Sequence, residues 1–256
     1  MSTNPRYFSE YETIDFERDG AGVLVMRLHS DNGPVQYSTR HHADWVHAFY
    51  DVGIDRDNRA VIITGTGDEF ISQMPMDGFV MRNATDWESI HSEGKRLLRN
   101  LMDIEVPVIG AINGPATVHA ELALLSDITI AASTATFQDA PHYPMYTVPG
   151  DGVHVVWNEL LGPNRASYFV LTGQTLSAEE AKALGVVNEV VSPDQVLTRA
   201  RELAAQIIQV PPLVSRYTRT VTTLKWKRLF DDALGYGLAL EGLATLDTIA
   251  RMSGGN

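Results

Sequence analysis

The chain has 256 residues, of which 20 are Lys or Arg and 32 are Asp or Glu, so its formal net charge is −12. An acidic chain of this kind is a poor candidate for binding a nucleic-acid backbone, which needs a basic face. It has no cysteine, which excludes disulfides, thiolate nucleophiles, iron–sulfur clusters and zinc–thiolate sites.

The N-terminal segment carries charges where a signal peptide would have an apolar run. The longest apolar stretches are strand-length, well short of the roughly 20 residues that a membrane-spanning helix needs. With 44% hydrophobic residues, the chain can build a substantial core. We therefore expect a cytoplasmic globular protein.

Strand and helix patterns alternate over the first part of the chain. Residues 22–28 and 60–64 are β-rich runs, and the second is typical of a buried strand. Between them, apolar residues at helical spacing predict a helix over 41–51. Residues 70–84 show no clean period and contain Pro75, which predicts a loop or a broken helix.

The alternation continues through the middle of the chain. A long helix is predicted to open at Asp86, whose carboxylate suits the helix dipole, and to run to about residue 102. Strands are predicted over 106–112 and 127–132, with a short apolar helix over 120–125 between them. Repeated strand–helix units of this kind indicate an α/β fold with a parallel sheet.

From Asn158 onward the pattern is mostly helical. Ser177 and Glu180 form a capping box before a short helix that ends near Gly185. Three longer helices are predicted after it, over residues 193–209, 212–232 and 233–252. There is no internal repeat or low-complexity linker, so a single domain with a helical C-terminal portion is the simplest description.

Histidine is the main catalytic resource, and His142 has the most informative context. It lies between Pro141 and Pro144, and Asp151 follows nine residues later in a compact turn. Two rigid segments joined by a short reversal can bring the imidazole and the carboxylate within hydrogen-bond reach. Such a pair makes a general base for water. The alternative interpretation is that Asp151 only closes an Asx turn.

His119 follows the turn Asn113-Gly114-Pro115 and precedes a predicted helix. The helix dipole disfavours an imidazolium there, so a neutral ring could polarise a substrate carbonyl. A capping contact is the other interpretation. The pair His41-His42 lies near a helix start beside Tyr37, where a surface position is the simpler expectation.

Several motifs are missing from the sequence. There is no His-Glu-x-x-His and no other spacing typical of metal ligands. The two glycine-rich motifs that bind nucleotide phosphates, Gly-x-Gly-x-x-Gly and Gly-x-x-x-x-Gly-Lys-Ser/Thr, do not occur. The serine-nucleophile motif Gly-x-Ser-x-Gly is also absent. We therefore expect no metal and no nucleotide cofactor.

Four stretches, in this order, resemble the crotonase (enoyl-CoA hydratase/isomerase) superfamily: AVIITGTGDEFISQ, IEVPVIGAINGPA, LLSDITIAASTATFQDA and LTGQTLSAEEAKALGVVNEVV. The resemblance covers nearly the whole chain. It implies an α/β crotonase fold, a spiral of ββα units over about residues 1–195 followed by a helical trimerisation region over 196–256. It also implies a single domain over 1–256 that assembles as a homotrimer or a dimer of trimers.

Hydratase chemistry does not carry over with the fold. The glycine-rich segment that holds a CoA thioester oxygen in hydratases is replaced by Pro115-Ala116-Thr117-Val118. Of the two hydratase glutamates, the first corresponds to Glu121, whereas His142 stands in place of the second. The other half of the oxyanion hole corresponds to the stretch around Ser72, which we expect to contact the substrate.

Three further stretches, NGPATVHAEL, FQDAPHYP and VPGDGVHVVW, resemble β-diketone hydrolases of the 6-oxocamphor hydrolase type. These enzymes hydrolyse a carbon–carbon bond between two ketones in a retro-Claisen reaction that needs no cofactor. The resemblance implies that His142 and Asp151 activate water and that His119 stabilises the enolate. It also pairs His42 with Glu241.

The same resemblance implies that Phe79 lines the substrate pocket and that Tyr37 replaces a tryptophan of the family. The implied substrate is a non-enolisable, bicyclic β-diketone, and the implied product is a keto acid. Two alternatives stay open: a CoA-thioester enzyme of the same fold, and a non-catalytic scaffold. Binding of an acyl-CoA would distinguish the first alternative from a diketone hydrolase.

Overall fold

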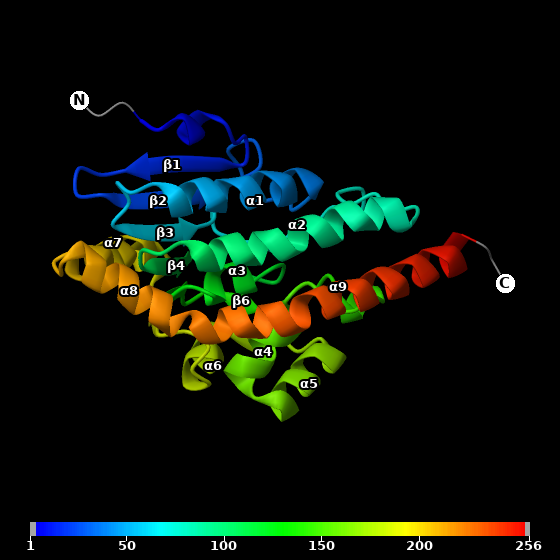
Figure 1. Cartoon of the computed structure of the whole chain (residues 1–256). Helices are drawn as coiled ribbons and strands as arrows, with labels where there is room; N and C mark the ends of the chain where they lie inside the picture. Colours follow the sequence, from blue (N-terminus) through cyan, green and yellow to red (C-terminus); the bar gives the residue numbers. More distant parts are fainter. Residues whose placement is uncertain (1–3, 254–256) are drawn as a thin grey trace.

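A computed structural model describes residues 4–253 of the chain. Its central feature is a six-stranded sheet in the order β1-β2-β3-β4-β5-β8 (Figure 1). Only the β1–β2 pair is antiparallel, and each later pair is parallel. A second, two-stranded sheet pairs β6 with β7. The strands are β1 Ile14–Arg18, β2 Val23–Leu28, β3 Ala60–Thr64, β4 Val108–Ile112, β5 Ile128–Ala132, β6 Thr136–Phe137, β7 Leu176–Ser177 and β8 Glu189–Val191.

The helices cover the sheet and extend beyond it. They are α1 Thr39–Ile54, α2 Ala84–Asp103, α3 Glu121–Leu124, α4 Val153–Leu161, α5 Pro163–Thr172, α6 Ala178–Ala183, α7 Val196–Ile207, α8 Pro212–Thr222 and α9 Leu224–Ser253, with 3₁₀ turns η1 Arg6–Ser9, η2 Tyr143–Met145 and η3 Pro193–Gln195. Helix α7 packs across β3, β4 and β5, while α2 packs between α1 and α9. Every residue of β3 and of β4 is buried, as expected of parallel strands that are covered on both faces.

In the segments that connect the main strands to the following helices, the chain forms a second layer held by isolated parallel β-bridges. Isolated bridges join Gln36 to Gln73, Ile71 to Ala116, and Ala116 to Phe137. Strands β2, β3, β4 and β5 are each followed by a short segment of this layer. This repeated strand, bridge and helix order is the spiral that the resemblance implies, and the bridges hold the turns in register.

Most of the predicted elements form within a few residues of their expected bounds. The strand predicted over 60–64 and the capping box of Ser177 with Glu180 are confirmed. The segment expected to be a loop over 70–84 has no regular element before α2, which is capped by Asn83. Two strands of the main sheet, β1 and β8, lie where the sequence predicted none.

One predicted boundary is wrong. The sequence placed a helix break between residues 232 and 233, whereas α8 ends before Thr223 and α9 runs on without interruption. The N–H and hydroxyl of Thr223 both donate to the carbonyl of Arg219 and close the last turn of α8. The buried guanidinium of Arg219 donates to the carbonyls of Ile104 and Leu101. This anchors the end of α8 to the core, so the chain turns there.

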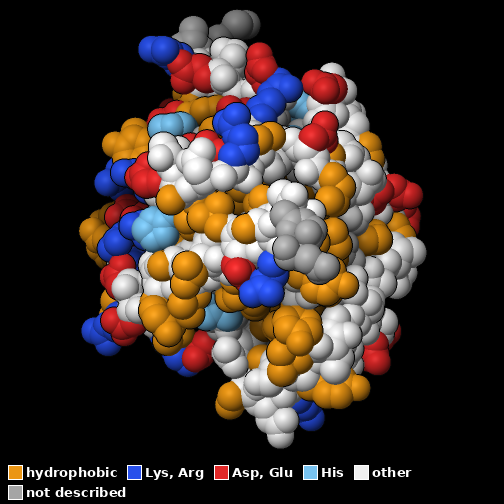
Figure 2. Space-filling model, turned by 90° about the vertical axis from the view of Figure 1, so that its right-hand side faces the viewer, with side chains coloured by type: hydrophobic (Ala, Val, Ile, Leu, Met, Phe, Trp, Pro, Cys, Tyr) orange, Lys and Arg blue, Asp and Glu red, His pale blue; other side chains and the backbone are white. Residues whose placement is uncertain are grey.

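Apolar side chains remain on the surface of α9. Tyr236 and Leu243 are each 70% exposed. Figure 2 shows hydrophobic side chains spread over the face at the C-terminal end of the helix, with charged ones mainly toward the margins. Assembly into trimers stays a prediction. Within residues 4–253, none of the helices combines the length and apolar character that crossing a membrane requires.

Two glycines let the turn before α4 approach α9 closely. A Cβ placed on Gly237 would lie 2.3 Å from the carbonyl oxygen of Gly150, and one on Gly150 would lie 2.1 Å from the carbonyl oxygen of Gly237. Neither position can carry a larger residue unless the backbone moves. The contact holds the turn that contains Asp151 against the part of α9 that contains Glu241.

This contact predicts a contrast between two glycines of the same helix. Gly237→Ala forces the turn and the helix apart, and overpacking of this kind costs about 1–3 kcal/mol. Gly235→Ala is the matched control, because its Cβ would meet only Cδ of the Lys95 side chain, at 3.7 Å. Alanine favours a helix over glycine by about 1 kcal/mol, so this control keeps or gains stability. Urea unfolding measures both free energies, and equal stabilities would contradict the packing described.

Candidate active site

Six ionisable side chains from four separate segments meet beneath α9. One segment links β4 to α3, one follows β6, one precedes α4, and the last is α9 itself. All six side chains are buried or nearly so, with side-chain exposures between 2% and 14%. They are His119, Glu121, Asp139, His142, Asp151 and Glu241.

His142 is held between carboxylates on both sides of its ring. Its Nδ1 lies 2.5 Å from Oδ1 of Asp139. Its Nε2 lies 3.4 Å from Oδ2 of Asp151 and 3.7 Å from Oε1 of Glu241. A proton on Nδ1 is therefore directed to Asp139, which leaves Nε2 as the ring atom that faces the rest of the site.

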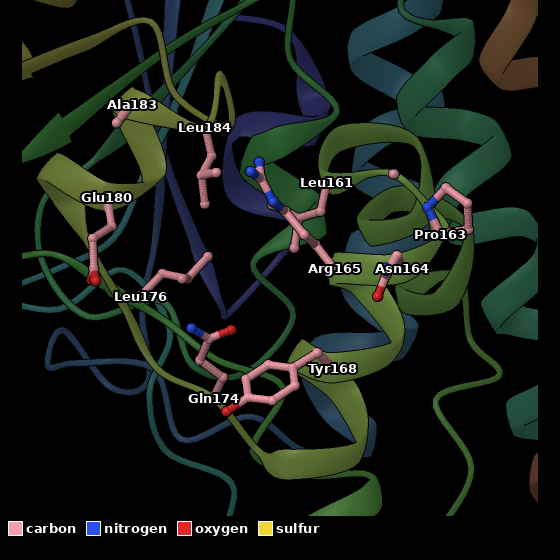
Figure 3. Close-up of a pocket in the computed structure, with 11 residues that line it drawn as sticks. Leu161, Pro163, Asn164, Arg165, Tyr168, Gln174, Leu176, Glu180, Ala183 and Leu184 are labelled. Carbon is pink, nitrogen blue, oxygen red and sulfur yellow. The ribbon is translucent and has the colours of Figure 1, made fainter.

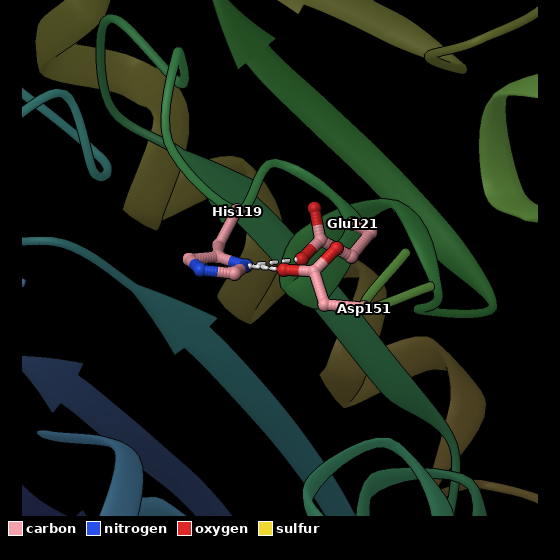
Figure 4. A group of neighbouring side chains, drawn as sticks. All are labelled: His119, Glu121 and Asp151. Atoms are coloured by element: carbon pink, nitrogen blue, oxygen red, sulfur yellow. Dashed lines mark hydrogen bonds and ion pairs between the residues drawn. The ribbon is translucent and has the colours of Figure 1, made fainter. Parts of the chain in front are cut away.

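His119 stands on the other side of Asp151 (Figure 4). Its Nδ1 lies 2.5 Å from Oε1 of Glu121 and 3.3 Å from Oδ2 of Asp151. The same oxygen of Asp151 therefore lies between the two histidines. The backbone of His119 has a φ of +49°, a left-handed conformation that is uncommon for residues other than glycine.

The charges of this cluster shift its pKa values strongly. Burial acts to lower the pKa of His142, but the charges of Asp151 and Asp139 outweigh it and raise the pKa well above its usual value. The pKa of His119 is also raised, because Glu121 and Asp151 outweigh its burial. The carboxylates thus favour the protonated ring, opposite in direction to the expected effect of the helix dipole, since α3 has only four residues. That His119 is neutral stays a prediction.

The three carboxyl groups nearest the histidines differ from one another. Burial would raise the pKa of Asp151, but the two imidazoles outweigh it and lower the pKa below its usual value, so this group stays charged. Burial raises the pKa of Glu241 to about 7 and also raises that of Glu121. Oε2 of Glu121 and of Glu241 has no hydrogen-bond partner among residues 4–253. Glu241 can therefore take up a proton near neutral pH.

Tyr37 brings a phenol to the same place. Its ring centroid lies 4.4 Å from that of His119, and the side chain is completely buried. Burial and the nearby charge of Asp151 raise its pKa well above 10, so the hydroxyl stays protonated. In the part of the chain that the structure describes, this hydroxyl has no hydrogen-bond partner. It is therefore a buried donor that is available to a ligand.

Phe79 lies in the loop between β3 and α2. Its ring centroid is 5.5 Å from that of Tyr37 and 6.1 Å from that of His42. The structure therefore brings Phe79 next to Tyr37, and its contact with a substrate stays a prediction.

The predicted pair of His42 with Glu241 is not formed. Nδ1 of His42 lies 2.9 Å from Oε2 of Glu93, on the neighbouring helix α2, while Glu241 faces His142. The physical reason is the packing of α1 on α2, which places Glu93 closer to His42. The expectation that His41 and His42 lie at the surface is also wrong, since both are buried.

Ser72 does not join the cluster either. Its hydroxyl donates to the carboxylate of Glu69, three residues earlier in the same loop. The backbone N–H groups of Thr117 and Val118 donate to the carbonyl of Ile71, at 2.9 and 3.1 Å. These two N–H groups lie in the segment that corresponds to the thioester-binding loop of hydratases, and here they hold the second layer of the fold together.

Sequence reasoning missed the role of Asp139. It stands three residues before His142, and an aspartate at that distance from a histidine in a proline-bounded turn was a usable signal. Glu93 was also missed. It lies in the middle of a long amphipathic helix, where a glutamate is ordinary, so the sequence carries no signal for it.

A surface cavity of about 790 Å³ lies elsewhere, between α5 and α6 (Figure 3). Its charged lining residues are Arg165 and Glu180. None of the predicted site residues lines it, so it is separate from the histidine cluster.

Comparison with known proteins places the chain in a family. Residues 18–229 match the family model described as enoyl-CoA hydratase/isomerase. The chain therefore belongs to the enoyl-CoA hydratase/isomerase family, the crotonase superfamily.

Within this family, one solved structure matches almost the whole chain. It is a β-diketone hydrolase from the cyanobacterium Anabaena, bound to (S)-3-oxocyclohexyl acetic acid. The two are 41% identical with a TM-score of 0.95, covering 97% of this chain and 100% of the other. An enoyl-CoA hydratase/isomerase from Mycobacterium paratuberculosis is 25% identical with a TM-score of 0.86, covering 93% of this chain and 95% of that one.

Curated relatives carry a different name. A carnitinyl-CoA dehydratase from Salmonella arizonae is 37% identical over 180 residues, covering 68% of this chain and 67% of the relative. Others from Salmonella are aligned over 64% of their length, just under two thirds. The superfamily is thus common to all the comparisons, while the named activities differ.

The carboxylates around His142 should shift the pH at which its ring is half protonated. Since they stabilise the protonated ring in the folded protein, the midpoint lies above the usual value of about 6.5. His41, whose pKa burial lowers, is the internal control and titrates below that value. NMR of the ring protons against pH measures both. Asp139→Asn removes one negative charge and lowers the His142 midpoint; a midpoint below 6.5 in the unmodified protein would contradict this account.

Proposed function

We propose that this protein hydrolyses a carbon–carbon bond of a β-diketone in a retro-Claisen reaction. The observation that carries the proposal is the position of Asp151, whose Oδ2 is 3.4 Å from Nε2 of His142 and 3.3 Å from Nδ1 of His119. One carboxylate thus serves two imidazoles. The similarity to the Anabaena β-diketone hydrolase over the full chain supports the same activity.

The proposed base is Nε2 of His142. In its neutral form the ring donates Nδ1–H to Asp139, which leaves a lone pair on Nε2 to take a proton from water. The charges of Asp139 and Asp151 then stabilise the imidazolium that forms, as the carboxylate does for the histidine of a hydrolytic triad. Their charge also raises the pKa of His142. The neutral base therefore becomes abundant at a higher pH than for an ordinary histidine.

The resulting hydroxide adds to one carbonyl carbon of the diketone. The tetrahedral intermediate then re-forms a carbon–oxygen double bond and breaks the bond to the carbon that separates the two carbonyls. The electron pair of the broken bond stays on that carbon and is delocalised onto the second carbonyl as an enolate. Tyr37 and His119 supply the donors for the enolate oxygen. The imidazolium of His142 returns its proton to the enolate carbon, so that diketone and water give one keto acid.

A CoA-thioester activity is the second candidate, and the curated dehydratase relatives favour it. Hydratases hold the thioester oxygen with backbone N–H groups after the Asn-Gly turn. Here Thr117 and Val118 donate to Ile71 instead, and His142 occupies the place of a hydratase glutamate. These features favour the diketone hydrolase. Binding of an acyl-CoA to the purified protein, with no turnover of diketones, would favour the second candidate.

Loss of the base tests the proposal. His142→Ala removes the group that activates water, and a general base contributes about 10²–10⁴ in rate. The expected result is a loss of that size in kcat for a bicyclic, non-enolisable 1,3-diketone. The rate is measured from the appearance of the keto acid. The matched control is His47→Ala, an exposed histidine on α1, which leaves kcat unchanged. Near-normal turnover by His142→Ala would rule out this base.

Loss of the phenol tests the enolate site separately. Tyr37→Phe removes one donor to the enolate oxygen, which typically costs about 10²–10³ in kcat. Because the Tyr37 hydroxyl has no protein partner in the region described, its removal breaks no hydrogen bond, and the free energy of unfolding does not fall. Steady-state kinetics and urea unfolding of the same variant measure the two effects. Full activity would exclude Tyr37 as a donor.

A further inference from the structure

Two overlapping sets of imidazole and carboxylate ligands meet in the cluster. One set consists of His142, Asp151 and Glu241, and the other of His119, Glu121 and Asp151. In each set, the three ligand atoms lie within 4.8 Å of one another. Asp151 belongs to both sets. Imidazole nitrogen and carboxylate oxygen are both ligands that zinc accepts in proteins.

The spacing of these atoms suits a small tetrahedral ion. Zinc binds imidazole nitrogen and carboxylate oxygen at about 2.0–2.2 Å, so the ligand atoms of a tetrahedral site are about 3.3–3.6 Å apart. Nε2 of His142 lies 3.4 Å from Oδ2 of Asp151 and 3.7 Å from Oε1 of Glu241. Nδ1 of His119 is 3.3 Å from the same Asp151 oxygen.

The orientation of His142 is also that of a metal ligand. Histidines that bind metals commonly donate their other N–H to a carboxylate, which fixes the ring and increases its basicity. Asp139 occupies this position, 2.5 Å from Nδ1, and it is itself buried. The free lone pair of a neutral His142 therefore points toward Asp151 and Glu241.

The cluster also carries more acidic than basic groups. Four carboxyl groups surround two imidazoles, and Oε2 of Glu121 and Oε2 of Glu241 lack partners among the described residues. These two residues are only 1% and 8% exposed. Buried carboxylate oxygens without a partner are costly, and a divalent cation bound by Glu241 would compensate that carboxylate. This observation is independent of the spacing of the ligand atoms.

We propose that this cluster binds one Zn²⁺ ion through His142, Asp151 and Glu241. The mixture of imidazole and carboxylate suits zinc better than magnesium, which prefers oxygen ligands in an octahedron. Zinc binding itself does not depend on the proposed function. Its consequence does: a zinc ion on Nε2 occupies the lone pair that the base needs, so zinc inhibits diketone hydrolysis.

Calorimetric titration of zinc chloride into the chelator-treated protein tests the binding without any substrate. The expected result is saturable binding of one ion per chain, with no comparable binding of magnesium chloride. Glu241→Gln and Asp151→Asn each remove a ligand and weaken binding at least about tenfold. Asp139→Asn removes the partner of a ligating histidine, a change that typically costs about 10–100-fold in affinity.

His47→Ala is the control, because this exposed histidine lies outside the cluster; it retains the affinity of the unmodified protein. Cobalt(II) reports the geometry, since a tetrahedral site gives intense visible absorption that Glu241→Gln abolishes. Circular dichroism verifies that each variant is folded. Absence of saturable zinc binding, or binding of equal strength in folded Glu241→Gln and Asp151→Asn, would overturn the proposal. Zinc binding by a protein that hydrolyses no diketone would contradict only the proposed function.

Discussion

Burial of several carboxyl groups around two imidazole rings is the constraint on which the rest of the site depends. Isolated charges in a protein interior are strongly unfavourable, so buried ionisable groups must be paired or neutralised. Asp151 meets this requirement through both histidines, and Asp139 through His142 alone. The same pairing raises the pKa of each histidine. The groups that stabilise one another in the resting protein are thus the groups that set the protonation of the proposed base.

The spiral fold explains how distant parts of the chain reach this cluster. Each turn leaves the main sheet, forms a short bridged segment, and only then enters the next helical region. Tyr37 follows one bridged residue, His119 follows another, and His142 comes after β6. Successive turns are in register, so their side chains meet on one side of the second layer. Glu241 reaches them because the glycines at 150 and 237 let α9 approach the turn that carries Asp151.

Much of the fold could be predicted from local sequence, whereas much of the site could not. Buried strands such as 60–64 show in hydrophobicity, and the capping box at Ser177 is a local signal. The strand β8 has only three residues, and a hydrogen bond between residues far apart in the sequence supports it, since the side chain of Asn188 accepts from the N–H of Thr129.

The site shows the same division between local and distant signals. The approach of His142 and Asp151 follows from a short reversal, but the pairing of His42 with Glu93 arises from two helices packing together. No spacing in the sequence shows the ligand sets either, because their members come from separate turns.

The proposed reaction uses the imidazole and carboxylate cluster and water to break a carbon–carbon bond of a diketone that carries no coenzyme A. Product analysis in water labelled with heavy oxygen tests this claim most directly. A bicyclic 1,3-diketone is incubated with the protein, and the product is examined by mass spectrometry. The account predicts a keto acid that has gained one water molecule and whose carboxylate carries the solvent oxygen. Recovery of unchanged diketone, under conditions in which the protein turns over an acyl-CoA, would contradict it.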